Sequence, residues 1–231
     1  MSLIKVQDVK KIYNGGEGEV TALGGVSFDV VEGEFVTLMG PSGSGKSTLL
    51  TMLGAMNPPT SGSIIVDDID VYSLKSEKRA DFRSEYLGFV FQQFQLIPYL
   101  TAAENVMLPL AITGRPNREQ VQMAQTVLEK VGLGNKGSRL PNQLSGGEQE
   151  RVAIARAIVN EPPILFADEP TGALDSKNSE EIMNLFKHLN KEGQTIIMVT
   201  HNPEFLSYVD RGIFIKDGKL DESRHGRKMA V

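Results

Sequence analysis

The chain has 231 residues, with 24 Lys and Arg against 29 Asp and Glu and a formal net charge of -5. This length predicts one domain or two closely joined lobes. The acidic balance argues against a nucleic-acid-binding protein, which usually needs a basic field. The lack of cysteine excludes disulfides, thiol catalysis and thiolate metal sites. We find neither a signal peptide nor an apolar run of about 20 residues, and therefore expect a cytoplasmic protein without membrane insertion.

Apolar segments of strand length alternate with helical patterns along the chain. Strands are predicted at 3–9, 26–33, 34–39, 63–68, 87–92, 164–168 and 195–200, and helices at 46–56, 101–112, 118–133, 145–160 and 177–193. This alternation predicts an α/β fold with a mostly parallel sheet and an antiparallel β region near the N-terminus. We expect one domain over 1–231, with a core of 1–92 and 160–231 and an inserted helical subdomain at 93–159.

The segment GPSGSGKS, residues 40–47, matches the phosphate-binding pattern G-x-x-x-x-G-K-[ST] and lies between a predicted strand and a predicted helix. Its glycines let backbone N–H groups turn toward an anion, and the helix N-terminus adds a positive dipole. Lys46 would contact the β- and γ-phosphates of a nucleotide, and Ser47 would bind Mg²⁺. An ordinary glycine-rich turn is the alternative. The predicted phosphate loop comprises Gly40, Pro41, Ser42, Gly43, Ser44, Gly45, Lys46, Ser47 and Thr48.

Polar side chains stand at the ends of three further predicted strands. Gln92 ends one strand, Asp168 and Glu169 end the next, and His201 follows the last. Because ligands of open α/β sheets bind at the carboxyl ends of the strands, we expect these residues beside the phosphate loop. Asp168 would hold Mg²⁺ and Glu169 would polarise the attacking water. Gln92 would coordinate the metal or orient a water, and His201 would donate to the γ-phosphate. The alternative for each is an ordinary polar strand end.

A second glycine-rich turn, LSGGEQERVAIARA at 144–157, opens another predicted helix, and we call it the signature segment. Ser145 and Glu148 form an S-x-x-E capping box, which alone explains why a helix begins here. The box does not require Gly146 and Gly147, which cost about 1 kcal/mol each in a helix relative to alanine. Because two glycines leave the helix N-terminus open to an anion, we predict a second phosphate site, for a nucleotide bound to another molecule.

Four segments, GPSGSGKST, LSGGEQERVAIARA, ILFADEPTGALD and VTH, occur in an order that resembles the nucleotide-binding subunit of ABC transporters over about residues 3–218. The resemblance implies an ATPase that dimerises head to tail around two Mg-ATP. The phosphate loop of one copy would face Ser145, Gly146 and Gly147 of the other. Tyr13 would stack on adenine, although it also fits an ordinary strand end, and Asp175 would cross the dimer.

The resemblance also implies an integral membrane permease, which would move with the helical subdomain and hold the chain peripherally at the cytoplasmic face of the membrane. GFVFQQFQLIPYLTAAENVMLPL and PTGALDS resemble lipoprotein-releasing, macrolide-export and antimicrobial-peptide-resistance systems, which implies export or extrusion. A cassette that drives a signalling complex without moving a solute remains open. A soluble relative acting on nucleic acid or ribosomes usually has two cassettes or a coiled-coil insertion. Position 148 is Glu where the family most often has Gln, which places a negative charge beside the second phosphate site.

Overall fold

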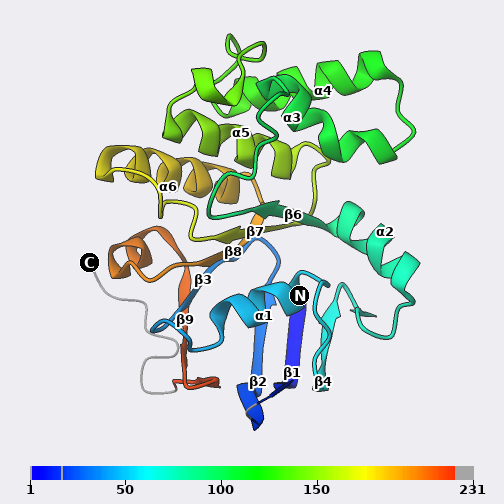
Figure 1. Ribbon diagram of the computed structural model, residues 1–231, viewed down its shortest axis with the longest axis vertical. Helices are drawn as coiled ribbons and strands as arrows, with labels where there is room; N and C mark the ends of the chain where they lie inside the picture. The colour runs from blue at the N-terminus through cyan, green and yellow to red at the C-terminus, as the bar shows by residue number, and fades with distance from the viewer. Residues whose placement is uncertain (1, 17, 222–231) are drawn as a thin grey trace.

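The computed structural model describes residues 2–16 and 18–221, which form two sheets with helices between and above them (Figure 1). The first sheet is antiparallel and has the order β2-β1-β4-β5, with β1 (Ser2–Gly15), β2 (Gly18–Val31), β4 (Ser61–Val66) and β5 (Ile69–Asp70). The second sheet has the order β10-β9-β3-β8-β7-β6. Its strands are β3 (Phe35–Met39), β6 (Leu87–Val90), β7 (Ile164–Asp168), β8 (Thr195–Val199), β9 (Arg211–Lys216) and β10 (Lys219–Leu220).

All pairings from β9 through β3, β8 and β7 to β6 are parallel, and β10 pairs antiparallel with β9. The predicted α/β fold, with its parallel sheet and N-terminal antiparallel region, is therefore confirmed. The sequence prediction missed β5, β9 and β10, and it divided the long β1–β2 hairpin into shorter strands. Polar residues and glycines between positions 10 and 25 obscure the period-two pattern of that hairpin.

The helices are α1 (Lys46–Leu53), α2 (Ser76–Tyr86), α3 (Ala102–Met107), α4 (Asn117–Lys130), α5 (Gly146–Ile158) and α6 (Ser176–Lys191). Short 3₁₀ segments are η1 (Leu108–Ile112), η2 (Pro141–Gln143) and η3 (Pro203–Tyr208). The helix predicted over 101–112 is divided into α3 and η1, and Pro109 lies near the start of η1. Proline interrupts an α-helix because its ring removes an N–H donor. The sequence prediction missed α2, which buries only Phe82 and so shows no apolar periodicity.

The parallel sheet separates two hydrophobic cores. Leu165 and Ala167 of β7 pack into the core formed with α3, α4, α5 and α6, whereas Ile164 and Phe166 pack into the core formed with α1 and the antiparallel sheet. Figure 1 shows α6 on one side of the parallel sheet and α1 on the other. Since strands buried on both faces read as continuous apolar runs, this arrangement explains segments such as ILFA and TIIMV.

One carboxyl group is buried inside the helical layer. Glu150 of α5 has no exposed surface, and neither of its side-chain oxygens has a hydrogen-bond partner. Burial raises the pKa of Glu150 to about 9, although the nearby charge of Arg156 opposes the rise. The Arg156 guanidinium instead donates to the backbone oxygens of Phe94 (2.7 Å) and Gln95 (2.6 Å). Glu150 is therefore protonated at neutral pH.

Glu150→Gln should flatten the pH dependence of stability. Because the folded-state pKa of Glu150 is raised, its contribution to stability is fully present below the ordinary glutamate pKa and is lost as pH rises toward about 9. Relative to Glu150→Gln, the wild-type free energy of unfolding should fall across this window by an amount on the order of a few kcal/mol. Urea denaturation at several pH values measures it, with the exposed Glu180→Gln as the control. A pH-independent difference between Glu150→Gln and wild type would contradict the burial argument.

Candidate nucleotide-binding site

A cavity of about 610 Å³ lies at the carboxyl ends of the parallel strands. It is lined by Ala22, Gly40, Pro41, Ser42, Gly43, Gly45, Lys46, Ser47, Thr48, Gln92, Asp168, Glu169, Val199 and His201. The order β3-β8-β7-β6 makes the four strands neighbours, so the residues that follow them share one edge. The structure thus brings Gln92, Asp168, Glu169 and His201 together with the phosphate loop. Of the loop residues, only Ser44 does not line the cavity.

The phosphate loop is packed so closely that two of its positions admit no side chain. A Cβ on Gly40 would overlap the backbone oxygen of Ile215, and a Cβ on Gly45 would lie 2.5 Å from the backbone oxygen of Ala22. Gly45 also has a φ of 103°, a conformation that side chains rarely adopt. A Cβ on Gly43 would meet no atom within 4 Å. The loop is therefore fixed against β2 and β9 on one side and open on the other.

Lys46 and Ser44 place polar groups inside this loop. The Lys46 ammonium is largely buried and donates to the backbone oxygens of Gly40 (2.9 Å) and Pro41 (2.8 Å). The hydroxyl of Ser44 is buried without a hydrogen-bond partner. A buried cation held only by carbonyl oxygens, next to an unsatisfied hydroxyl, fits a loop that receives an anion.

The three predicted metal-binding residues face the same cavity. Ser47 offers a hydroxyl, Gln92 an amide and Asp168 a carboxylate. Burial raises the pKa of Asp168, the neighbouring Glu169 raises it further, and Lys46 opposes the rise. Oxygen donors of these kinds suit Mg²⁺, and a cation would offset the repulsion between the two carboxylates. The donor set therefore fits a magnesium ion.

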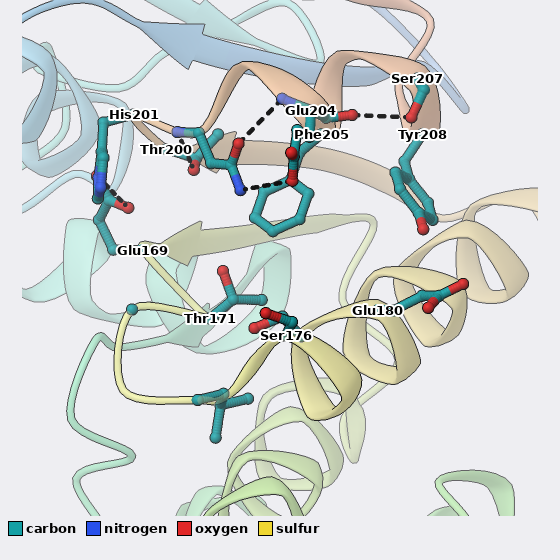
Figure 2. Close-up of a pocket in the computed structure, with 14 residues that line it drawn as sticks. Glu169, Thr171, Ser176, Glu180, Thr200, His201, Glu204, Phe205, Ser207 and Tyr208 are labelled. Carbon is teal, nitrogen blue, oxygen red and sulfur yellow. Dashed lines mark hydrogen bonds and ion pairs between the residues drawn. The ribbon is translucent and has the colours of Figure 1, made fainter.

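Glu169 and His201 are in direct contact (Figure 2). The His201 Nδ1 atom lies 2.9 Å and 3.0 Å from the two carboxylate oxygens of Glu169. Glu169 has a φ of 48°, which is uncommon for a non-glycine residue, and its N–H donates to the backbone oxygen of Val199 at 3.0 Å. Its side chain is only 16% exposed, against 75% for His201. The strained, anchored backbone thus fixes the carboxylate, while the imidazole lies largely exposed to solvent.

This Glu169–His201 pair also lines a second cavity, of about 540 Å³, which Figure 2 shows between the start of α6 and η3. The two residues are 32 positions apart, and β7 and β8 must be neighbours for them to meet. The sequence indicates a role for each of the two residues but not the contact between them. The pair forms a boundary between the nucleotide-sized cavity and the second one.

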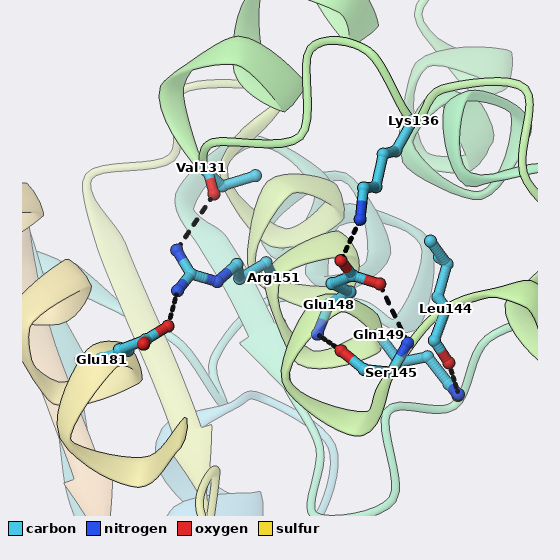
Figure 3. Close-up of polar contacts among 8 residues, drawn as sticks. All are labelled: Val131, Lys136, Leu144, Ser145, Glu148, Gln149, Arg151 and Glu181. Carbon is cyan, nitrogen blue, oxygen red and sulfur yellow. Dashed lines mark hydrogen bonds and ion pairs between the residues drawn. The ribbon is translucent and has the colours of Figure 1, made fainter. Parts of the chain in front are cut away.

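The signature segment begins α5 as the sequence predicts (Figure 3). The Ser145 N–H donates to a Glu148 carboxylate oxygen at 2.9 Å, and the Glu148 N–H donates to the Ser145 hydroxyl at 3.3 Å. This confirms the predicted capping box. The other carboxylate oxygen of Glu148 accepts from the Lys136 ammonium. The hydrogen bond from Lys136 is the main cause that lowers the pKa of Glu148, followed by that from Ser145.

The two glycines of the signature segment differ in their surroundings. A Cβ on Gly147 would lie 2.5 Å from Oδ1 of Asn178 on α6, whereas a Cβ on Gly146 would lie 3.3 Å from a methyl group of Leu174. Asn178 is itself held by Asp175, since its N–H and its side-chain amide each donate to that carboxylate at 2.8 Å. These hydrogen bonds lower the pKa of Asp175. Gly147 therefore has a packing role within the chain that the sequence did not indicate.

Besides Ser44, five predicted site residues do not line the cavity of the phosphate loop: Tyr13, Ser145, Gly146, Gly147 and Asp175. Tyr13 lies on β1 and is 42% exposed. Its hydroxyl accepts from the side-chain amide of Asn57 at 2.7 Å, and the Lys11 ammonium lies 5.1 Å from the centre of its ring. The remaining four lie at the starts of α5 and α6. One chain therefore carries two features suited to bind phosphate, the phosphate loop and the signature segment, and they do not share a cavity. We call them the two phosphate-type features.

A glycine-rich loop that can hold phosphate, with carboxylates on an adjacent strand of the same cavity, has the organisation of a P-loop ATPase. The sequence profile of the ABC transporter family matches residues 23–172, more than half of the chain. The chain belongs to the ABC transporter family, as its sequence predicts, and is an ATP-binding, ATP-hydrolysing cassette. Among residues 2–16 and 18–221, no helix is long and apolar enough to cross a membrane.

Individual relatives agree with this family. YknY of Bacillus subtilis, an uncharacterized ABC transporter ATP-binding protein, is 46% identical over 226 residues, which cover 98% of each chain. The macrolide export ATP-binding/permease protein MacB of Syntrophobacter fumaroxidans is 48% identical over 224 residues, 96% of this chain and 31% of MacB. The cassette MJ0796 of Methanocaldococcus jannaschii, solved as a post-hydrolysis dimer with ADP and Pi, has a TM-score of 0.86 and 45% identity. The match covers 94% of this chain and 96% of the MJ0796 chain.

Gly147→Ala should destabilise the protein by about 1–3 kcal/mol, because the added methyl group would overlap Asn178. The Asn178 amide cannot turn away without losing its hydrogen bond to Asp175. Asn178→Ala in the same chain should restore most of the loss, and urea denaturation of both variants measures it. Gly146→Ala is the matched control and should cost less, since it approaches only the end of a flexible leucine. Equal costs at the two glycines would contradict the packing role of Gly147.

Proposed function

We propose that two copies of the chain associate head to tail around two Mg-ATP and that the closed dimer drives a membrane permease in export. The observation that carries this proposal is the separation of the two phosphate-type features, because the start of α5 contributes nothing to the cavity of its own phosphate loop. The dimeric structures solved for MJ0796 support an assembly that joins such features between two copies. Ser145, Gly146 and Gly147 of one copy would then contact ATP held by the other.

ATP binding would use the phosphate loop and the N-terminus of α1. The ammonium of Lys46, now on two carbonyl oxygens, would exchange them for phosphate oxygens, which are stronger partners for a charged donor. Backbone N–H groups of residues 42–48 would surround the phosphates. Tyr13, with its hydroxyl held by Asn57, would stack on the adenine. These contacts would orient the nucleotide before the chemistry begins.

Ser47, Gln92 and Asp168 would hold the magnesium ion. When bound, Mg²⁺ neutralises charge on the phosphate oxygens during phosphoryl transfer. The carboxylate of Asp168 is the charged member of this donor set, and burial beside Glu169 disfavours its ionised form until a cation is present. We therefore expect a bound cation to favour the ionised carboxylate of Asp168.

Glu169 would act on the attacking water. Its carboxylate is fixed by the anchored backbone, so it can accept a hydrogen bond from a water placed in line with the γ-phosphate. In this structure the Nδ1 atom of His201 contacts the Glu169 carboxylate. When ATP enters, the exposed ring of His201 would turn toward the γ-phosphate. That exchange would free Glu169 for the water. Hydrolysis would then begin only after the nucleotide has replaced the Glu169–His201 contact.

Movement would reach the permease through the helical subdomain that we propose for residues 93–159. Arg156 of α5 holds the backbone oxygens of Phe94 and Gln95, which follow Gln92 in the chain. A change at Gln92 on binding magnesium would therefore pull on α5, whose first turn carries Ser145. The similarity to MacB, which its name describes as a macrolide export ATP-binding/permease protein, supports export as the direction of transport. Asp175 would contribute to the dimer from the start of α6.

Glu169→Gln should lower ATP turnover by about 100-fold or more while ATP binding persists, because the amide keeps the side-chain shape but cannot serve as a base. The stalled variant should accumulate as a dimer in the presence of ATP. Phosphate release and light scattering measure the two effects on the same sample. Wild-type turnover in this variant would remove Glu169 from the mechanism.

Ser145→Arg separates a role between subunits from simple helix capping. We expect this variant to bind ATP as a single chain, since Ser145 lies outside the cavity, but not to hydrolyse it. Ser145→Thr is the control, because threonine keeps the capping hydroxyl. Loss of ATP binding by the Ser145→Arg monomer would show that the substitution disturbs the phosphate loop of its own chain.

A further inference from the structure

A charge pair at the start of α5 is not used by the mechanism above. The Lys136 ammonium donates to one carboxylate oxygen of Glu148, and the other oxygen closes the capping box with Ser145 (Figure 3). Both side chains are partly buried, with 38% of Lys136 and 25% of Glu148 exposed. Glu148 is thus held ionised and in a fixed position, directly above the first turn of the helix.

The loop that carries Lys136 is also fixed. The Lys136 N–H donates to the backbone oxygen of Leu133 at 2.9 Å, and its own backbone oxygen accepts from Arg139 at 3.0 Å. On either side of that turn, the backbone oxygens of Gly137 and Arg139 accept from the first N–H groups of α3, at 2.9 Å and 2.8 Å. The start of α3 therefore holds the loop in place, and the ammonium is presented to α5 by an anchored backbone.

The position of Glu148 creates an electrostatic conflict for the proposed function. A helix N-terminus favours an anion, but a carboxylate three residues after the cap repels a phosphate that approaches the same turn. Glutamine at this position would make the capping box without that charge. In this chain Lys136 offsets that charge, because its ammonium donates directly to the Glu148 carboxylate.

We infer that Lys136 is a positioning residue for ATP hydrolysis, which neutralises Glu148 so that the signature segment can receive the γ-phosphate of ATP bound to the other copy. This inference rests on the proposed head-to-tail dimer. Lys136 touches neither the phosphate loop nor its cavity, so it acts through Glu148 and through the charge at the start of α5. It follows that substitutions at the two positions act in opposite directions.

The test compares four full-length variants in the Glu169→Gln background, with ATP as the probe and the dimer dissociation constant as the readout. Lys136→Ala should weaken the ATP-dependent dimer about fivefold, the scale of one partly exposed charge. Glu148→Gln should strengthen the dimer, because it leaves the positive charge of Lys136 uncompensated. Lys136→Ala with Glu148→Gln should return close to the starting value. Lys136→Arg should resemble lysine because it keeps the charge.

Lys130→Ala is the matched control. Lys130 also forms a partly exposed ion pair, but its partner Glu192 follows the last turn of α6, at the opposite end of that helix from Asn178, which contacts Gly147 of the signature segment. We expect no change in dimerisation for this variant. ATP binding to the single chain should be the same in all variants, and the loss in Lys136→Ala should shrink at high salt, because salt screens exposed charges. A purely structural role would give neither the salt dependence nor the recovery in the double variant.

Two results would overturn the inference. If Lys136→Ala and Lys130→Ala weaken the dimer equally, or if Glu148→Gln fails to restore the Lys136→Ala chain, the charge of Lys136 does not act on the second phosphate site. These results would leave the proposed dimer intact. If the Glu169→Gln chain that retains both Lys130 and Lys136 forms no ATP-dependent dimer, the proposed function fails and the inference fails with it. Thermal unfolding of each variant identifies any loss that comes from misfolding.

Discussion

The parallel pairing of β3, β8, β7 and β6 determines where the chemistry of this protein lies. Each strand is buried on both faces, so the charged side chains of these segments lie where the strands end. Because the four strands are parallel neighbours, those ends form one edge, and the phosphate loop, Gln92, the two carboxylates and His201 meet there. The tight packing of Gly40 and Gly45 against neighbouring strands then fixes the loop in that edge.

This constraint explains which parts of the site could be predicted from the sequence. The ends of apolar strands are visible in sequence, so the grouping of Asp168, Glu169, Gln92 and His201 followed from fold class alone. Contacts between side chains are not visible in the same way. Lys136 meets Glu148 only because α3 holds an intervening loop, and Asn178 meets Gly147 only because α5 and α6 pack together. The polar helix α2 was missed because it lacks the periodic apolar face on which prediction depends.

The start of α5 satisfies several demands at once. The capping box satisfies N–H groups where the helix begins, Gly147 makes room for Asn178, and Lys136 offsets the charge that the box introduces. From the sequence we predicted the cap and explained both glycines by the approach of an anion. The structure instead separates them, since Gly146 meets only a flexible leucine whereas Gly147 approaches an amide held by Asp175. We therefore regard Gly146 as the residue whose missing side chain matters most for access by a second nucleotide.

The central claim is that the phosphate loop of one copy meets the signature segment of another. The chain contains no cysteine, so Ser42→Cys, at an exposed position of the phosphate loop, and Asn142→Cys, at an exposed position three residues before Ser145, each introduce a single thiol. The two single-cysteine chains, both in the Glu169→Gln background, are mixed and treated with a short bifunctional thiol reagent. The account predicts a crosslinked dimer that requires ATP and both chains. Absence of the crosslink with ATP, or its formation to the same extent without ATP, would contradict the account.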